Sequence, residues 1–323
     1  MNSDMIKAVD PKAKEVRSLM DMHSDAYDLG KAFEAASANA DGSAESSYLL
    51  GLFQYNGSCT SSDKSAALDS FKKAAEGGYA PASIVCEEIS RNPADIQDNL
   101  VSQRFKAEQG DPVACKALFQ IYDTGKTSDG KKAPVLKDHA EAIRLYLPCA
   151  EQGDADAQNT IGFMYLMGKG VAKDRELAEK LLKKAAESGC AQAAHRIAVM
   201  YDQGQCYVDP DLDKAVQWYQ RAADLGYAES QFQLAGIMMM QDSKYFNESR
   251  AVKYLTAAAD GGQVEAQHQL GMAYAFGSNG LRRSVPKARK YLEASCKGGY
   301  DQAMVDYANL LIDLQSLKGQ ITQ

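Results

Sequence analysis

Residues 153–189 read GDADAQNTIGFMYLMGKGVAKDRELAEKLLKKAAESG, which has the layout of two helices joined by a glycine-containing turn. Small residues stand at the second and fourth positions after Gly153. Gly168 follows fifteen positions after Gly153, where a helix that ends in a left-handed residue favours glycine. The small pair Ala185-Ala186 closes the second helix before the next glycine. The segment therefore predicts a helical hairpin.

The same layout recurs along most of the chain. Glycines followed by the same small-residue pattern stand at positions 42, 78, 110, 153, 189, 226, 262 and 299. Successive anchors are 36, 32, 43, 36, 37, 36 and 37 residues apart. A hairpin of this length buries its apolar face only against its neighbours, so the pattern predicts an all-α array of stacked helical hairpins.

These residues resemble the Sel1-like repeat family, a branch of the tetratricopeptide-type helical repeats. The first half of the family pattern is matched by Ala155-Asp-Ala157-Gln158, Ile161-Gly162-Phe163-Met164-Tyr165 and Gly168-Lys-Gly170-Val171, and the second half by Trp218-Tyr219 and Arg221-Ala222-Ala223. The resemblance covers about residues 40–310. It implies a right-handed α/α superhelical solenoid and, for cytoplasmic members, a non-enzymatic role in binding other proteins.

The repeats predict the organisation of the whole chain. We expect a disordered N-terminus (1–11), N-terminal capping helices (12–41), seven repeats (42–77, 78–109, 110–152, 153–188, 189–225, 226–261 and 262–298), a C-terminal capping helix (299–317) and a disordered tail (318–323). The short second repeat contains Arg91-Asn-Pro93, which predicts an early end to its first helix. The long third repeat has a polar, basic loop at 125–134.

Composition excludes several classes of protein. The 323 residues carry a net charge of −7, which argues against a nucleic-acid binder with a basic face. No run approaches the roughly 20 apolar residues that span a membrane. The first ten residues lack the charged and apolar regions of a signal peptide, so we expect a cytoplasmic protein.

No residue pattern predicts catalysis, a metal site or a cofactor. The seven cysteines form no Cys-x-x-Cys and no regular pairs, so we interpret them as free thiols used as small apolar residues. Ser-x-x-Lys begins at Ser61, Ser128 and Ser284, each time in an inter-helix loop and without Lys-Thr-Gly. A Ser-Lys hydrolase of penicillin-binding type is therefore the least favoured reading. No carboxylate pair stands out as buried.

A partner-binding surface is predicted on the first helix of each hairpin, which in tetratricopeptide-type solenoids lines the concave face. Large apolar residues and two histidines occupy the expected positions there: Phe163, Leu166, Met167, His195, Val199, Phe232, Met239, Met240, His268, Met272 and Phe276. A secondary surface would contain Tyr48, Leu52 and Tyr55. Adaptable methionine and exposed apolar area are typical of surfaces that accept peptides or helices. Alternatively, strong superhelical curvature packs these residues against neighbouring hairpins.

His195 and His268 both fall at the sixth position after an anchor glycine, two repeats apart. At that spacing they cannot share one metal ion. They are either part of the binding surface or ordinary surface residues.

Several functions remain open on this reading. The favoured one is an adaptor or scaffold that binds a peptide, helix or domain of another protein. An inhibitor or immunity-type protein that wraps an enzyme or toxin is the alternative, and the acidic balance suits a basic partner. Carbohydrate or cell-wall binding would require a periplasmic location. The oligomeric state is also open, because residues 310–314 could lie against the groove of their own chain or of a second copy.

Overall fold

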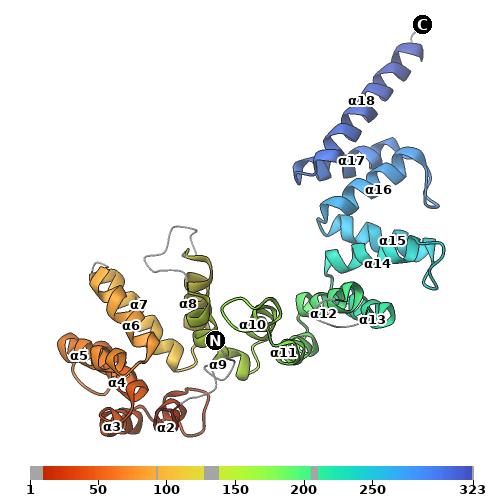
Figure 1. The fold of residues 1–323 in the computed structure, drawn as a ribbon. Helices are drawn as coiled ribbons and strands as arrows, with labels where there is room; N and C mark the ends of the chain where they lie inside the picture. Colours follow the sequence, from red (N-terminus) through yellow and green to blue (C-terminus); the bar gives the residue numbers. More distant parts are fainter. Residues whose placement is uncertain (1–9, 92–93, 127–137, 205–209, 322–323) are drawn as a thin grey trace. The chain divides into compact units, whose positions relative to one another are not determined.

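The computed structural model describes residues 10–91, 94–126, 138–204 and 210–321, and helices are the regular elements of these residues (Figure 1). The chain divides into an N-terminal unit, residues 1–184, and a C-terminal unit, residues 185–323. In both units consecutive helices pair as hairpins, which confirms the predicted all-α array.

The N-terminal unit contains ten helices within the described residues: α2 (Pro11–Met20), α3 (Leu29–Asn39), α4 (Ala44–Asn56), α5 (Lys64–Glu76), α6 (Ala80–Arg91), α7 (Ala94–Glu108), α8 (Pro112–Thr124), α9 (His139–Glu151), α10 (Ala155–Met167) and α11 (Arg175–Glu187), whose last turn falls in the next unit. The C-terminal unit continues with α12 (Ala191–Gln203), α13 (Leu212–Asp224), α14 (Ala228–Met239), α15 (Glu248–Asp260), α16 (Val264–Phe276), α17 (Val285–Lys297) and α18 (Asp301–Ile321). From α4 onward, the even-numbered helices follow the anchor glycines and are called helices A. Their hairpin partners are called helices B.

Local sequence explains where the helices begin and end. Several helices B start at an Asp or Asn whose side chain accepts backbone N–H groups of the first turn, as Asp63 and Asn247 do. Helices α10 and α16 end at Gly168 and Gly277, which adopt the left-handed conformation with φ of 70° and 72°. Helix α14 lacks such a glycine, and Met240 leaves it in an extended conformation.

A repeated glutamine joins each of three helices A to the preceding helix B. Gln158, Gln231 and Gln267 each donate from Nε2 to the carbonyl oxygen of an alanine eight residues earlier, at 2.9, 3.2 and 3.0 Å. The alanines belong to the small pair that closes helix B. This contact gives the glutamine of the repeat pattern a structural role at the junction between hairpins.

Within a hairpin, a small residue of helix A allows close approach of helix B. A Cβ added at Gly271 would lie 2.8 Å from Cγ and 3.1 Å from the backbone nitrogen of Leu292. At Gly162 it would lie 3.0 Å from Cγ of Leu182. At these two positions a larger side chain would have to displace the leucine of helix B, so glycine allows the two helices to approach closely.

The N-terminal unit is not a simple row of hairpins, because α7 packs against α4, α6, α8 and α9. Phe105 of α7 contacts Phe53 of α4, with the ring centroids 5.2 Å apart. The turn after α2 also reaches the end of α7, where the Met22 N–H donates to the carbonyl oxygen of Gln109 at 3.1 Å. The inner side of this unit is consequently filled by its own helices.

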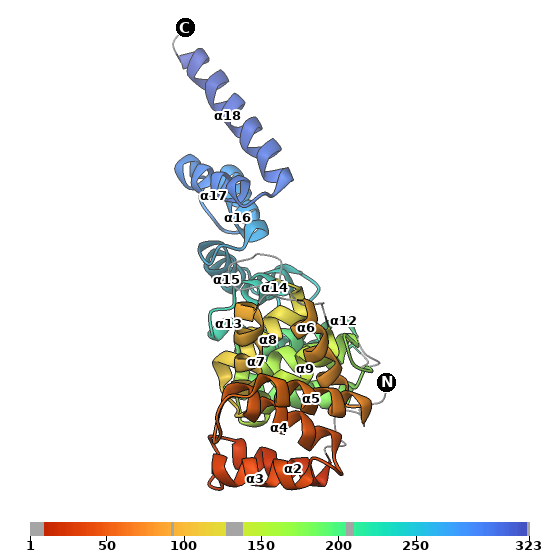
Figure 2. The same cartoon turned by 90° about the vertical axis from the view of Figure 1, so that its left-hand side faces the viewer.

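Two helix boundaries bear on the predicted organisation. Helix α6 ends at Arg91 after 12 residues, against 13 for α8 and α10, so the early end expected there is not seen, and residues 92–93 lie outside the described residues. Helix α18 runs on to Ile321, four residues past the predicted end at 317, so the tail 318–323 is helical at least to that residue. A single Gly319 does not break a helix, because glycine costs only about 1 kcal/mol at an interior position. Residues 1–9, and most of the basic loop at 125–134, lie outside the described residues. Figure 2 shows α18 extending away from α17.

Candidate partner-binding surface

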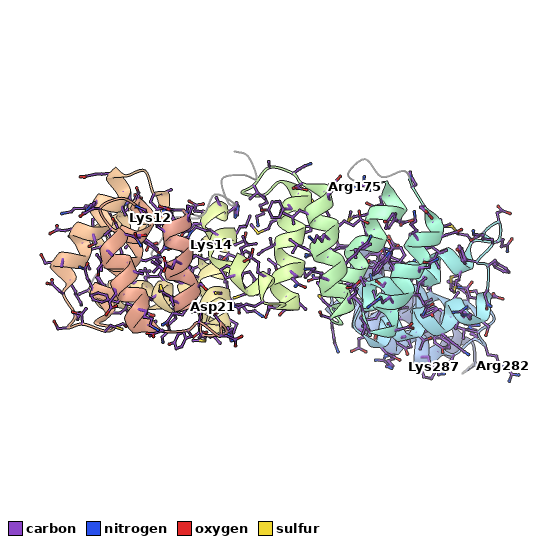
Figure 3. All side chains as sticks on the ribbon, turned by 90° about the horizontal axis from the view of Figure 1, so that it is seen from below. Lys12, Lys14, Asp21, Arg175, Arg282 and Lys287 are labelled. Carbon is purple, nitrogen blue, oxygen red and sulfur yellow. The ribbon has the colours of Figure 1, made fainter. Side chains whose placement is uncertain are left out.

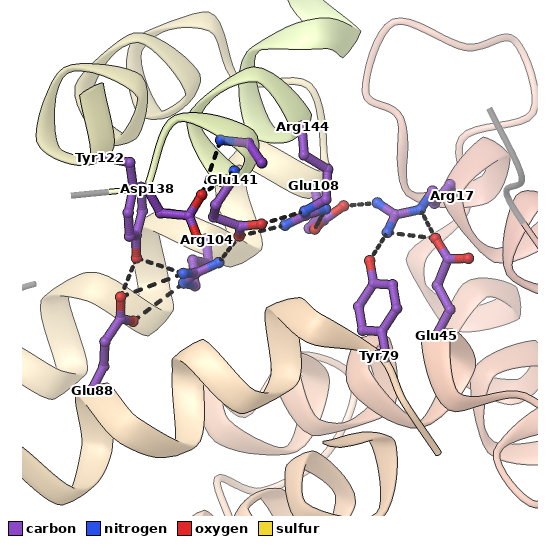
Figure 4. Close-up of polar contacts among 11 residues, drawn as sticks. Arg17, Glu45, Tyr79, Glu88, Arg104, Glu108, Tyr122, Asp138, Glu141 and Arg144 are labelled. Carbon is purple, nitrogen blue, oxygen red and sulfur yellow. Dashed lines mark hydrogen bonds and ion pairs between the residues drawn. The ribbon is translucent and has the colours of Figure 1, made fainter. Parts of the chain in front are cut away.

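The most prominent polar feature of the described residues is a chain of arginine and glutamate side chains inside the N-terminal unit (Figure 4). Arg104 of α7 is completely buried and lies between Glu88 of α6 and Glu141 of α9. Its Nε and Nη2 atoms lie 3.4 Å from the two carboxylate oxygens of Glu88. The hydroxyl of Tyr122 contacts both Arg104 and Glu88. The ion pairs therefore join α6, α7, α8 and α9.

The network continues to the N-terminal helices. Arg144 donates to Glu141 at 2.8 Å and to Glu108 at 2.9 Å. Glu108 also pairs with Arg17 of α2, whose other nitrogens donate to Glu45 at 2.8 Å and to the Tyr79 hydroxyl at 3.0 Å. The expectation that no carboxylate pair is buried is wrong, because Glu45, Glu88, Glu108 and Glu141 are all buried.

Charge compensation keeps these groups ionised. Burial disfavours the charged form of Glu141, but Arg144 and Arg104 outweigh it and lower its pKa to about 2. Burial likewise opposes the charge on Arg104, yet Glu88, Tyr122 and Glu141 together raise its pKa well above the usual value. Each acid faces a base and the groups are enclosed by helices, so the network holds the unit together and has the character of a structural core rather than a catalytic centre.

No sequence signal marked Arg104. It stands six positions before the anchor Gly110, and the same place in the repeat at 153–188 holds Lys183, whose side chain is 43% exposed. The burial of Arg104 follows from the inward packing of α7, which depends on contacts far apart in the sequence.

The predicted secondary surface is not exposed. Tyr48 and Leu52 are completely buried and Tyr55 nearly so, because α4 is covered by α5, α7 and α2. The Tyr48 ring lies 5.9 Å from that of Phe71 and 5.2 Å from that of Tyr79. This is a correction: these three side chains belong to the core of the N-terminal unit. On α10, Leu166 is buried as well and Phe163 is half-buried, whereas Met167 is 53% exposed.

In the C-terminal unit the predicted residues lie on three successive helices A. Two side chains at the ends of these helices are strongly exposed, Met240 at 63% and Phe276 at 73%. The others are half-buried: His195, Val199, Phe232, Met239, His268 and Met272. Phe232 and Met239 contribute part of their surface to the core between α14, α15 and α16. The stacking of successive hairpins brings these residues together. Between α12 and α14, for example, Nδ1 of His195 lies 2.9 Å from the hydroxyl oxygen of Ser230.

Both histidines stabilise junctions between repeats. The His195 ring packs on Tyr227 with centroids 4.9 Å apart, and burial lowers the pKa of His195. Nε2 of His268 lies 2.7 Å from Oδ2 of Asp306 on α18, and its ring packs on Tyr300. In two repeats, the histidine at this position therefore contacts the next helix A. Both histidines are half-buried rather than fully exposed.

Within the described residues, no group of histidines, cysteines and carboxylates has the arrangement of a metal site. Cys115 and Cys149 are buried free thiols, and Cys59 is an exposed one. Of the three Ser-x-x-Lys motifs, the one at 128–131 lies outside the described residues. Ser284 of another is the residue that precedes α17 and makes no capping hydrogen bond with its side chain. None of the helices described in the structure is both long and apolar enough to cross a membrane.

The fold, with its recurring glutamine and glycine contacts, defines a protein built of helical-hairpin repeats. Comparison with known families makes this specific: the Sel1 repeat family matches residues 44–79, 112–154, 155–190, 191–227, 228–263 and 264–300. The chain belongs to the Sel1 repeat family. The matched segments follow the predicted repeats from 42 onward, while the short repeat at 78–109 is not matched.

Two curated relatives share part of this array. The chain is 40% identical over 162 residues to DAP3-binding cell death enhancer 1 of Mus musculus, covering 50% of this chain and 31% of that protein. It is 29% identical over 100 residues to chitin synthase regulatory factor 2 of Schizosaccharomyces pombe, covering 30% and 20%. The chain thus spans about a third or less of the length of the curated relatives it matches.

Solved structures show the same fold. A Sel1 repeat protein from Oxalobacter formigenes is 25% identical, with a TM-score of 0.52 over 88% of this chain and 99% of that one. A protective antigen of uropathogenic Escherichia coli displaying an SLR fold is 24% identical, with a TM-score of 0.54 over 97% of this chain and 68% of that one.

Proposed function

We propose that this protein is a non-enzymatic scaffold that binds a peptide, a helix or a domain of another protein on the helices A of its C-terminal unit. The observation that carries the proposal is the exposure of Met240, directly after α14, and of Phe276 at the end of α16, on helices that also carry the half-buried Phe232, Met239 and Met272. Exposed apolar side chains that adjoin one another favour contact with a partner. The family relationship supports the same general role.

Three contacts keep this surface continuous. His195 of α12 contacts Ser230 of α14 at 2.9 Å, and Gln263 at the start of α16 donates to Glu229 of α14 at 3.2 Å. His268 of α16 then pairs with Asp306 of α18. Consecutive helices A are thereby fixed side by side, and a partner would meet a preorganised surface with little cost in conformational entropy.

Gly236 offers a way to test the surface without disturbing the fold. It is exposed on α14, in the same helix as Phe232 and Met239, and a Cβ added there meets no atom within 4 Å. A bulky Gly236→Arg side chain would therefore stand on the proposed surface while leaving the core intact. Gly236→Ala is the matched control, since it changes the same position and adds only a methyl group.

The experiment compares the tagged full-length chain and both variants in cells that naturally make the protein, with quantitative mass spectrometry of the proteins that co-purify. We expect Gly236→Arg to lose the partners that the wild type and Gly236→Ala retain. Circular dichroism and thermal unfolding establish that both variants are folded. Equal recovery of the same partners by Gly236→Arg and Gly236→Ala would show that this face of the helices A does not bind them.

A further inference from the structure

The end of α16 and the loop that follows it carry an exposed aromatic residue and two exposed arginines. Phe276 ends α16, Arg282 and Arg283 lie in the loop, and Lys287 lies in the first turn of α17. The side chains of Arg282 and Lys287 project from the same edge of the C-terminal unit (Figure 3). We call Phe276, Arg282, Arg283 and Lys287 the α16–α17 edge.

Backbone contacts hold these residues close together. The loop turns sharply at Gly277, and the Ser284 N–H donates to the carbonyl oxygen of Tyr274 at 2.8 Å. A Cβ added at Gly277 would lie 3.1 Å from the backbone nitrogen of Arg283, so Arg283 stands against the residue that follows Phe276. Nζ of Lys287 lies 4.9 Å from the centroid of the Tyr274 ring. Arg282 and Arg283 therefore lie on an ordered turn between Phe276 and Lys287.

Unlike Lys214 and Lys297 of the same unit, the three cations of the edge have no carboxylate partner among the described residues. Lys214 pairs with Asp211 at 3.0 Å and Lys297 with Glu293 at 2.9 Å. Among the described residues, Arg282 and Arg283 form no ion pair or hydrogen bond, and Lys287 contacts the Tyr274 hydroxyl instead, at 3.5 Å. Glu248 places a carboxylate beside the turn, with its Cδ 3.8 Å from a Cβ added at Gly280. Three positive charges thus remain against one negative charge.

We propose that the α16–α17 edge binds an acidic segment of a partner protein. Carboxylates of that segment face Arg282, Arg283 and Lys287, and an apolar side chain of the segment packs on Phe276. Arginine and aromatic residues are enriched among the residues that dominate binding energy, and complementary charge speeds and orients association. The proposal rests on the proposed scaffold function and specifies the chemistry of the partner: acidic at this edge, although the net charge of −7 would by itself favour a basic one.

The test uses the full chain and a short fluorescein-labelled peptide in which Glu residues alternate with Leu and Trp, with binding followed by fluorescence anisotropy. Two further peptides replace every Glu by Gln, or Leu and Trp by Ala. We expect the acidic apolar peptide to bind and both altered peptides to bind about tenfold more weakly or worse. Binding should weaken as salt is raised, because exposed charges are screened.

Matched variants locate the binding site on the protein. The triple variant Arg282→Gln, Arg283→Gln, Lys287→Gln removes three positive charges from the edge, whereas Lys214→Gln, Lys253→Gln, Lys297→Gln removes three exposed charges elsewhere in the unit. We expect about tenfold weaker peptide binding for the first triple and for Phe276→Ala, and little change for the second triple. Circular dichroism confirms folding of each variant.

Three results would overturn the proposal: equal binding by the two triple variants, equal binding of the Glu and Gln peptides, or a preference for single-stranded RNA over the acidic peptide at the same salt concentration. Loss of native partners in Gly236→Arg together with any of these results would leave the scaffold function standing while removing the acidic segment as its ligand. If the peptide binds at the edge but Gly236→Arg keeps its native partners, the acidic segment stands as a ligand and the proposed scaffold surface on the helices A does not.

Discussion

Nη1 of Arg104 on α7 donates a hydrogen bond to Oε1 of Glu141 on α9, and both side chains are buried. The two residues are 37 positions apart and belong to different hairpins. This pair therefore links the inward-packed helix α7 to α9, and removing one partner would leave a buried charge without compensation.

Arg104→Met should destabilise the N-terminal unit by about 3 to 5 kcal/mol, because it leaves the buried carboxylates of Glu88 and Glu141 with less compensation. The exposed pair Lys116–Asp156 provides the control, and Lys116→Met should cost less than about 1 kcal/mol. Urea unfolding followed by circular dichroism measures both. Equal midpoints for the two variants would contradict a stabilising role for the buried network.

The acid dependence of stability should contain a contribution from Glu141. Its pKa falls from 4.5 to about 2 on folding, so its stabilising contribution is complete above pH 4.5 and is lost as the pH falls toward 2. Over that range the difference in unfolding free energy between the wild type and Glu141→Gln should shrink by about 3 kcal/mol. Circular dichroism measures it, and the fluorescence of Trp218, the single tryptophan, reports the C-terminal unit as an internal control. A constant difference across this range would refute the assignment.

Two glycines of the C-terminal unit should respond to alanine in opposite directions. Gly236→Ala should stabilise by up to about 1 kcal/mol, since the site is open and alanine favours the helix. Gly271→Ala should destabilise by about 1 to 3 kcal/mol, because the new methyl group would meet Leu292 of α17. Thermal unfolding followed by Trp218 fluorescence compares them. Stabilisation by Gly271→Ala would mean that α16 and α17 are not in such close contact.

Cysteine reactivity should follow burial. Cys59 is exposed and, among the cysteines that the structure describes, should be the first alkylated by a maleimide in the native protein. Cys115 and Cys149 are buried in the same hairpin, and the hydrogen bond between them together with burial raises the pKa of Cys115. Both should react only after unfolding in urea. Mass-spectrometric peptide mapping gives the order, and early labelling of Cys115 would contradict the packing of α8 on α9.

Much of the fold could be predicted because its signals are local. The left-handed glycine at position 168, the close contact at Gly162 and the capping Asp63 each act within one hairpin, and a repeat shows such requirements several times over. The exposure of large apolar residues at the ends of helices A could also be predicted. The same position of three repeats holds Met167, Met240 and Phe276, and all three side chains are exposed.

The part that could not be predicted depends on how hairpins of unequal length assemble. The short repeat places α7 against α4, which buries Tyr48 and Leu52 completely, whereas most residues at the same positions of the C-terminal repeats are half-buried. Arg104 finds its partners 16, 18 and 37 residues away. The repeat pattern of the sequence predicts neither set of contacts. It shows what the hairpins have in common, whereas these contacts arise where one hairpin differs from the others.

The inward position of α7 also determines how freely the chain can be edited. In the C-terminal unit each helix mainly touches its sequence neighbours, so a hairpin such as α14–α15 is a module that can be deleted, duplicated or replaced by a designed repeat of the same register. In the N-terminal unit α7 packs against α4, α6, α8 and α9, so we expect deletion of one hairpin to disrupt the packing of the others. Single hairpins are therefore the units of redesign in the C-terminal unit, whereas the N-terminal unit has to be redesigned as a whole.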